Sequence, residues 1–224
     1  MKTRIASLLF AVVSSIATSQ ATVLVDTLGD FSTDFQGQNG LQYGYYTSPD
    51  VSSGTFATGG MSSAPGVWFG SEYLDTPQFN ADRQHPGASL LLPAVRRYTI
   101  GLGGEPSYTG LVQIAGSYGG PTPGGGGSVI GFVTVDGITL HSLPSDGSAA
   151  AIVNFDFLAS VSPGSHIDFG IMANGDANFD STFFTATVTA VPEPSSALLG
   201  LVAFACACSR RVRHSRKAES GPRE

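Results

Sequence analysis

The sequence predicts an all-β fold whose main domain is an antiparallel two-sheet β-sandwich. Between residues 22 and 190 the hydrophobic residues follow a period of two or form short runs, which Gly, Pro, Asn, Asp and Ser separate. The 224 residues include 29 Gly and 13 Pro, and only 12% are charged. No window outside the termini keeps a helical period, so helices are expected only at the two ends. Many short strands with little helix are typical of a sandwich.

Two strands and one hairpin carry this prediction in detail. In 166–172 and in 182–190, hydrophobic residues alternate with polar or small ones, and in 182–190 Phe183 lies on the face opposite Phe184. Asp136 and Gly137 between two β-rich runs predict a type I′ hairpin turn. The expected strands are 22–25, 41–46, 66–70, 94–100, 110–116, 128–135, 137–141, 150–158, 166–172 and 182–190.

The N-terminal segment has the three parts of a secretory signal. Lys2 and Arg4 give a positive start, an apolar stretch follows at 5–16, and small residues occupy the cleavage positions before residue 22. The stretch is shorter than the ~20 residues with which a helix spans a bilayer. We therefore expect residues 1–21 to be a signal helix that signal peptidase removes; a buried N-terminal helix is the alternative.

The C-terminal segment combines a Pro-Glu-Pro motif, a short apolar helix and a basic cluster. Pro192, Glu193 and Pro194 precede an apolar stretch that ends at Cys208, and an Arg-rich cluster begins at Arg210. Positive charge beside an apolar helix favours the cytoplasm for that end. This order of features resembles the PEP-CTERM sorting tail of Gram-negative bacteria. An apolar terminus packed on the domain is the alternative.

The resemblance implies a route through the cell envelope. In that family a short transmembrane helix holds the exported protein at the inner membrane until an exosortase, a membrane cysteine protease, processes the tail near the motif. Pro192, Glu193 and Pro194 would be the sorting motif of a tail at 191–217. Residues 218–224 would form a disordered C-terminus, and the released protein would reach the cell surface or the extracellular matrix.

The basic ends conceal an acidic domain. The whole chain has a formal net charge of −6, whereas residues 22–194 carry 15 Asp and Glu against three Arg, a net charge of −12. Such a surface repels nucleic-acid phosphates and favours cations, neutral sugars or basic partners. Both cysteines, Cys206 and Cys208, lie in the tail, so the domain offers no disulfide and no cysteine nucleophile.

Several fragments of residues 26–190 together resemble a family of exported, jelly-roll-like β-sandwich domains found beside such tails. The resemblance implies a jelly-roll-like domain at 22–190, similar in architecture to carbohydrate-binding sandwiches. Architecture alone does not identify a ligand. The fragments are Asp30 to Phe35, Asn39 to Tyr45, His85 to Gly87, Val95 to Tyr98, Gly110 to Gly116, Gly164 to Phe169 and Asn178 to Thr182.

Aromatic and basic side chains supply candidates for a carbohydrate site. Tyr43 and Tyr45 share one face of the expected strand 41–46, where flat rings offer a stacking platform; packing in the core is the alternative. Arg96 and Arg97 point to opposite faces of one strand, so one is expected to be buried against an Asp while the other reaches a ligand. The candidate ligand-binding residues are Tyr43, Tyr45, Trp68, His85 and Arg96.

A calcium loop is the sharpest local pattern. Asn174, Asp176, Asn178 and Asp180 place oxygen ligands at alternate positions, as in the first half of a calcium-binding loop. The pattern lacks the Gly and the Glu of an EF-hand, because Phe179 stands where the Gly would be and Thr185 stands where the Glu would be. A turn stabilised by Asx hydrogen bonds is the alternative.

Catalytic patterns are sparse, and we expect no catalytic residue. His166 and Asp168 share one strand face, which would suit a base and the residue that orients it, but a solvated polar face explains them equally well. Paired carboxylates of a glycosidase are the other candidates. They would come from Asp30, Asp34, Asp75 and Asp82.

These observations favour a non-catalytic surface or matrix protein that binds polysaccharide or another envelope polymer. The alternative is a secreted carbohydrate-active hydrolase with paired carboxylates. The expected partners are signal peptidase, exosortase and, transiently, the inner membrane; nucleic acid is not expected.

Overall fold

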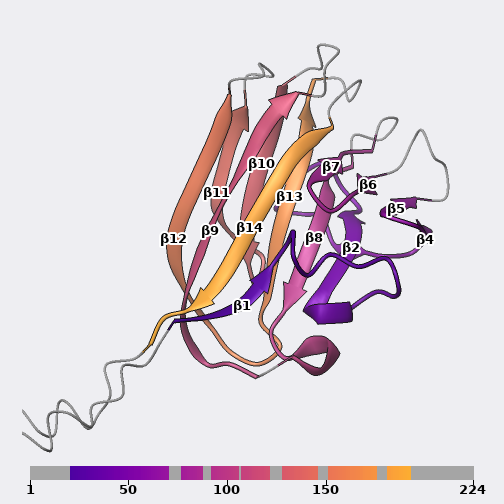
Figure 1. Ribbon diagram of the computed structural model, residues 1–224. Helices are drawn as coiled ribbons and strands as arrows, with labels where there is room; N and C mark the ends of the chain where they lie inside the picture. Colours follow the sequence, from indigo (N-terminus) through magenta and orange to yellow (C-terminus); the bar gives the residue numbers. More distant parts are fainter. Residues whose placement is uncertain are drawn as a thin grey trace, which may run out of the picture. The chain divides into compact units, whose positions relative to one another are not determined.

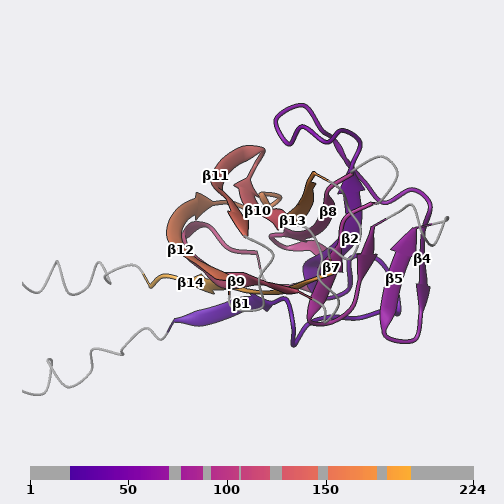
Figure 2. The ribbon, with the colours of Figure 1, turned by 90° about the horizontal axis from the view of Figure 1, so that it is seen from above.

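The computed structural model describes residues 21–70, 77–87, 92–105, 107–121, 128–145, 151–175 and 181–192. Residues Thr22–Val191 form one compact unit with two antiparallel sheets packed face to face (Figures 1 and 2). The predicted two-sheet sandwich is therefore confirmed. The helices expected at the two ends lie outside the described residues.

Sheet A contains eight strands in the order β12-β9-β14-β7-β6-β5-β4, with β1 paired to β14. In Figure 2, β12, β9 and β14 form the lower layer. Its strands are β1 (Thr22–Asp26), β4 (Met61–Ala64), β5 (Val67–Gly70), β6 (Gln78–Phe79), β7 (Arg83–His85), β9 (Gly110–Pro121), β12 (Ile152–Val161) and β14 (Thr182–Ala190).

Sheet B contains six strands in the order β11-β10-β13-β8-β2-β3. Its strands are β2 (Leu41–Tyr46), β3 (Phe56–Ala57), β8 (Ala94–Thr99), β10 (Ser128–Val135), β11 (Ile138–Ser145) and β13 (His166–Asn174). All ten expected strands are present, and β3, β4, β6 and β7 are additional. Two short 3₁₀ turns, Gln38–Gly40 and Leu102–Gly104, are the helical elements of the described chain.

The alternation read from the sequence determines which side chains enter the core. In β14, Phe184 and Val188 are fully buried while Phe183 is 41% exposed on the outer face. The turn between β10 and β11 has positive φ at both Asp136 (50°) and Gly137 (81°), which confirms the predicted type I′ geometry.

A buried arginine links the two sheets. Arg96 on β8 points into the core and is completely buried, with no carboxylate partner among the described residues. Its Nε donates to Gln84 Oε1 at 2.8 Å. The two Nη atoms donate to four backbone carbonyls, at 2.6 to 3.0 Å, on Thr27, Asn80, Ala81 and Arg83. All five N–H donors are therefore satisfied, which offsets the desolvation of the guanidinium.

Burial lowers the pKa of Arg96 to about 10, so the guanidinium stays protonated at neutral pH. Phe31 lies under the charge, with its ring centroid 5.7 Å from Cζ.

The outer face of sheet B carries a second buried cluster. Tyr46, Val95 and Phe132 pack together there, and Val51 and Phe56 contact them. Beside this cluster Asp168 accepts two hydrogen bonds from Arg97 at 2.7 Å, and the Tyr46 hydroxyl donates to its Oδ2. The residues after β2 thus cover part of sheet B, whereas no described segment covers the outer face of β9, β12 and β14.

We expect Arg96→Lys to destabilise the domain strongly. A lysine ammonium has three donors and so forms at most three of the five hydrogen bonds that the guanidinium donates, and the loss of two or more of these charge-assisted bonds costs roughly 2–6 kcal/mol. For a domain of this size the melting temperature should then fall by roughly 5–20 °C. Differential scanning calorimetry of the 22–191 fragment measures this shift.

The matched control is Arg83→Lys, the same exchange at a side chain that is 35% exposed. It should melt close to the wild-type temperature. Equal melting temperatures for the two variants would show that the Arg96 hydrogen bonds do not stabilise the fold as described.

Candidate binding site

Three of the predicted ligand-binding residues are core residues. Tyr43 is 1% exposed, Trp68 is 5% exposed and Arg96 is fully buried. The rings of Tyr43 and Trp68 stack with centroids 5.7 Å apart, and Trp68 Nε1 donates to the Ser32 carbonyl at 2.7 Å. Burial therefore overturns the stacking platform at Tyr43, because no ligand in solvent can reach its ring.

The other two predicted residues are partly exposed but lie in different sheets. Tyr45 is on β2 in sheet B, and its hydroxyl donates to the Gly59 carbonyl at 3.1 Å. His85 is on β7 in sheet A and lines a polar depression described below. The structure thus does not bring the five candidates together into one site.

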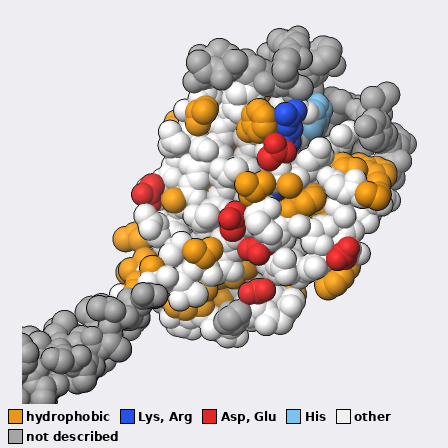
Figure 3. All heavy atoms as spheres, in the orientation of Figure 1, with side chains coloured by type: hydrophobic (Ala, Val, Ile, Leu, Met, Phe, Trp, Pro, Cys, Tyr) orange, Lys and Arg blue, Asp and Glu red, His pale blue; other side chains and the backbone are white. Residues whose placement is uncertain are grey.

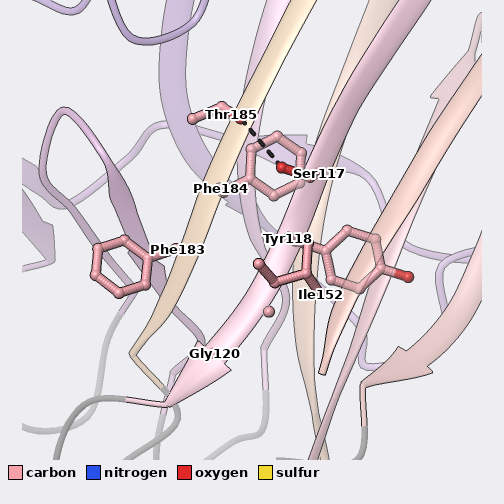
Figure 4. Close-up of a pocket in the computed structure, with 8 residues that line it drawn as sticks. Ser117, Tyr118, Gly120, Ile152, Phe183, Phe184 and Thr185 are labelled. Atoms are coloured by element: carbon pink, nitrogen blue, oxygen red, sulfur yellow. Dashed lines mark hydrogen bonds between the residues drawn. The ribbon is translucent and has the colours of Figure 1, made fainter. Parts of the chain in front are cut away.

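A depression of about 360 Å³ lies on the outer face of sheet A, beside Phe183 (Figure 4). The exposed side chains of Phe183 and Ile152 are apolar, while Ser117 and Thr185 contribute hydroxyls 3.4 Å apart. Figure 4 shows Phe183 and Ile152 on either side of β14. Its lining comprises Ser117, Tyr118, Gly119, Gly120, Ile152, Phe183, Phe184 and Thr185.

A second, polar depression of about 110 Å³ adjoins the first. Arg83 connects the two, since it lines the polar depression and places its Cζ 4.4 Å from the centroid of the Phe183 ring. The lining is made of hydrogen-bonding side chains: Gln78, Asn80, Arg83, Gln84, His85 and Ser181. We refer to Phe183 and both depressions together as the Phe183 site.

Strand pairing explains why these residues meet. β14 pairs with β7, so that Phe183 lies opposite Arg83, and with β9, so that Thr185 lies opposite Ser117. Directly opposed residues of antiparallel strands point to the same face, here the outer face of sheet A. Below the site, Thr187 and Thr189 continue a line of hydroxyl groups along β14.

The surface around the site carries little charge. Figure 3 shows orange hydrophobic side chains beside the blue and pale blue basic ones, with red acidic side chains scattered over a face that is otherwise mostly white. Arg83 is 35% exposed, whereas Arg97 is 20% exposed and bound to Asp168. Burial lowers the pKa of His85, which favours the neutral imidazole at pH 7, although a backbone contact with Pro86 opposes the shift.

The candidate catalytic groups do not assemble among the described residues. Asp168 is fully buried and bound by Arg97, while His166 Nδ1 lies 3.3 Å from Asp136 Oδ1. Asp30 accepts a hydrogen bond from the backbone N–H of Asp26. Neither depression is lined by a described Asp or Glu.

The calcium pattern and the sorting motif fall mostly outside the described residues. Asn174 is described, and its Nδ2 donates to Ser128 Oγ at 2.7 Å, but Asp176, Asn178 and Asp180 lie outside. The part of the chain that is described contains no group of three or more His, Cys, Asp or Glu suited to a metal ion.

Pro192 ends the last described segment, and Glu193 and Pro194 lie beyond it. Among the described residues, no helix has the length and hydropathy needed to cross a membrane.

Sequence reasoning placed Phe183 on the strand face opposite Phe184 but did not select it as a site residue. The available signal was a large aromatic residue among threonines on the outer face of 182–190. Arg83 and Ser117 carried no comparable signal, because the short strand β7 was not expected and its pairing with β14 is a long-range contact.

Comparisons with known proteins show similar structures only at a low level. No family model matches the chain, and no curated protein matches it. A family 35 carbohydrate-binding module from Clostridium thermocellum is 8% identical over 75% of this chain and 98% of its own, with a TM-score of 0.31.

A Podospora anserina GH26-CBM35 β-(1,4)-mannanase is 10% identical over 78% of this chain and 29% of its own, with a TM-score of 0.33. Rabbit GITRL is 12% identical over 46% of this chain and 75% of its own, with a TM-score of 0.30. At these TM-scores the likenesses carry no argument about function.

Acidification is expected to destabilise the domain through His85 and His141. Burial lowers the pKa of both side chains below the ordinary value of about 6.5. Below about pH 6.5 the unfolded chain therefore binds more protons than the folded one, and stability is lost as the pH falls toward the folded pKa values. Urea unfolding at about pH 7.5 and about pH 5.5, on either side of the ordinary histidine pKa, measures the loss.

The double variant His85→Gln/His141→Gln removes both groups and should lose less stability than the wild type over this interval. If both proteins lose the same amount, the buried histidines do not account for the acid sensitivity.

Proposed function

We propose that this protein is an exported, non-catalytic component of the cell surface or extracellular matrix. Its jelly-roll-like domain binds a neutral polysaccharide, or a similar envelope polymer, at the Phe183 site. The observation that carries this proposal is the combination at that site of an exposed aromatic ring, an apolar depression and an adjoining depression lined by hydrogen-bonding side chains.

The chemistry of the site suits a sugar. A pyranose presents C–H groups that pack on an aromatic or aliphatic side chain, and hydroxyls around its rim that donate and accept hydrogen bonds. Phe183 and Ile152 supply the apolar contacts. Gln84 is occupied by Arg96, but at the second depression the Asn80 amide offers donor and acceptor atoms, and Nε2 of the neutral His85 offers an acceptor.

Charge favours a neutral ligand. Residues 22–194 carry a net charge of −12, which opposes the approach of polyanions. Arg83 is the basic side chain at the site, and its guanidinium already stacks on Phe183 beside Asp82, with 3.9 Å between Nε and Oδ2. It is therefore placed to hydrogen-bond sugar hydroxyls and to hold the ring in position, rather than to attract an anionic polymer.

A binding role rather than hydrolysis is proposed because the described lining of the site holds hydroxyls, amides, one Arg and one His, with no pair of carboxylates that could act as acid and nucleophile. The alternative, a carbohydrate-active hydrolase, predicts release of reducing ends from a bound glycan. A binder leaves the glycan intact.

Export and sorting complete the proposal. The signal features at 1–21 and the Pro192-Glu193-Pro194 tail support secretion, transient retention at the inner membrane and processing by an exosortase. Asn174, Asp176, Asn178 and Asp180 are proposed as a calcium loop of the exported domain, so binding is best assayed both with calcium and with EDTA.

Phe183→Ala should weaken glycan binding by at least about tenfold, the size expected when an aromatic anchor worth about 1.4 kcal/mol is truncated. A glycan array with the 22–191 fragment identifies a ligand, and isothermal titration calorimetry measures the change. Leu111→Ala is the matched control, because Leu111 is 43% exposed on the same sheet but lies outside both depressions. Equal losses in the two variants, or none, would exclude the Phe183 site as the binding site.

Protein isolated from the native host should lack residues 1–21 and the Arg-rich segment from Arg210 onward. Intact-mass spectrometry of the exported protein measures both ends. Retention of residues 210–224 in a host that has an active exosortase would contradict the sorting proposal but not the binding site.

A further inference from the structure

We infer that β12 is a self-association edge, through which two copies of this domain join into one continuous sheet. β12 is the end strand of sheet A and pairs only with β9 among the described residues (Figure 1). Its ten residues make it the longest edge strand of the two sheets. In an antiparallel ladder every second residue directs its N–H and C=O away from the paired neighbour, so β12 presents a row of backbone groups that no other described strand pairs.

This edge lacks the features with which β-proteins block edge-to-edge pairing. Within Ile152–Val161 there is no Lys, Arg, Pro or Gly, and its pairing with β9 shows no bulge. Two of its outward side chains are large and apolar: Ile152 is 62% exposed and Leu158 is 59% exposed. An exposed, long and partly hydrophobic edge of this kind is a template for another strand.

The neighbouring edge of sheet B is protected by comparison. β11 contains Pro144, which has no N–H to donate, and its pairing with β10 is interrupted by an irregularity at Val133 and Thr134. The Leu143 carbonyl of β11 also accepts a hydrogen bond from the Tyr118 hydroxyl at 2.6 Å. The contrast between the two edges directs the inference to β12.

The sequence of β12 is complementary to itself in one antiparallel register. If Phe155 lies on a two-fold axis, Ile152 of one copy faces Leu158 of the other on the outer side, and Asn154 faces Asp156. The apolar pair then shields itself from water, and the Asn154 amide donates to the Asp156 carboxylate. On the inner side Val153 faces Phe157, so that no apolar residue is opposed to a charge.

Charge disfavours one of the two neighbouring registers. Sliding one copy by two residues places Asp156 directly opposite Asp156 of the other copy, and like charges opposed across strands are destabilising. The net negative charge of the domain opposes the approach of a second copy. β12 itself adds little to this repulsion, because Asp156 is its one charged residue. A second copy of this chain is therefore the occupant that the edge itself specifies.

Such a dimer would keep the outer faces of both copies of sheet A on the same side, because the two-fold axis is perpendicular to the sheet. Two Phe183 sites would then face the same polymer, which raises the apparent affinity without any new contact. The dimer does not depend on the binding proposal, and each can fail alone.

Sedimentation velocity of the 22–191 fragment tests the association. This fragment contains both sheets and all the ladder and core contacts described above. At about 100 μM, where even a weak interface is populated, the wild type should sediment as a dimer. Leu158→Lys places a charge on the edge and should give a monomer with an unchanged circular dichroism spectrum, whereas the control Leu111→Lys on the interior strand β9 should remain dimeric.

Cysteine cross-linking tests the register, since the fragment contains no native cysteine. Under mild oxidation, Asn154→Cys/Asp156→Cys should give a disulfide-linked dimer, because each new cysteine faces its counterpart in the other copy. In the variant Asn154→Cys/Leu158→Cys, the cysteine at 154 faces Asp156 of the other copy and the cysteine at 158 faces Ile152. This variant should therefore stay largely uncross-linked. A monomeric wild type, a dimer that persists in Leu158→Lys, or equal cross-linking in both cysteine pairs would overturn the inference.

Discussion

The burial of one guanidinium, that of Arg96, is the constraint on which the arrangement of both sheets depends. A charged group in a core is tolerated only when every donor finds an acceptor, since desolvation costs several kcal/mol. Arg96 leaves β8 in sheet B and reaches carbonyls after β1 and around the turn before β7 in sheet A. Two of those carbonyls, on Asn80 and Arg83, also accept a hydrogen bond from each other's backbone N–H across the turn between β6 and β7, so Arg96 reinforces this turn and ties it to sheet B.

The segment that Arg96 fixes also presents the candidate site. Gln84 points inward and accepts from Arg96 Nε, and because side chains alternate along β7, Arg83 and His85 point outward. Arg83 then lies over the Phe183 ring and joins the two depressions. The inner face of β7 thus holds the acceptor for Arg96, and its outer face holds two residues of the Phe183 site. The outer face of sheet A around this site is open, whereas the outer face of sheet B is partly covered.

The sequence predicted the long strands because their alternation extends over many residues, as in 182–190. It could not show β6 and β7, since two or three residues carry no measurable period. Alternation also cannot tell which face is inner: Tyr43 was a candidate for a surface platform, and it packs on Trp68 in the core. Arg96 and Arg97 were correctly assigned to opposite faces, but the Asp partner belongs to Arg97, and backbone carbonyls far along the chain replace it at Arg96. The site depends on such long-range pairings, which local patterns do not contain.

Hydrogen–deuterium exchange of residues 78–85, compared between the wild type and Arg96→Lys, tests the central role of this arginine most directly. If Arg96 holds the turn before β7, exchange of these amides should rise at least about tenfold in the variant, the factor that corresponds to 1.4 kcal/mol of local opening. The ladder between β9 and β12, which Arg96 does not contact, should lose protection only through the global destabilisation of the domain, so its exchange should rise no more than the fall in global stability requires. Unchanged exchange at 78–85 would contradict the account.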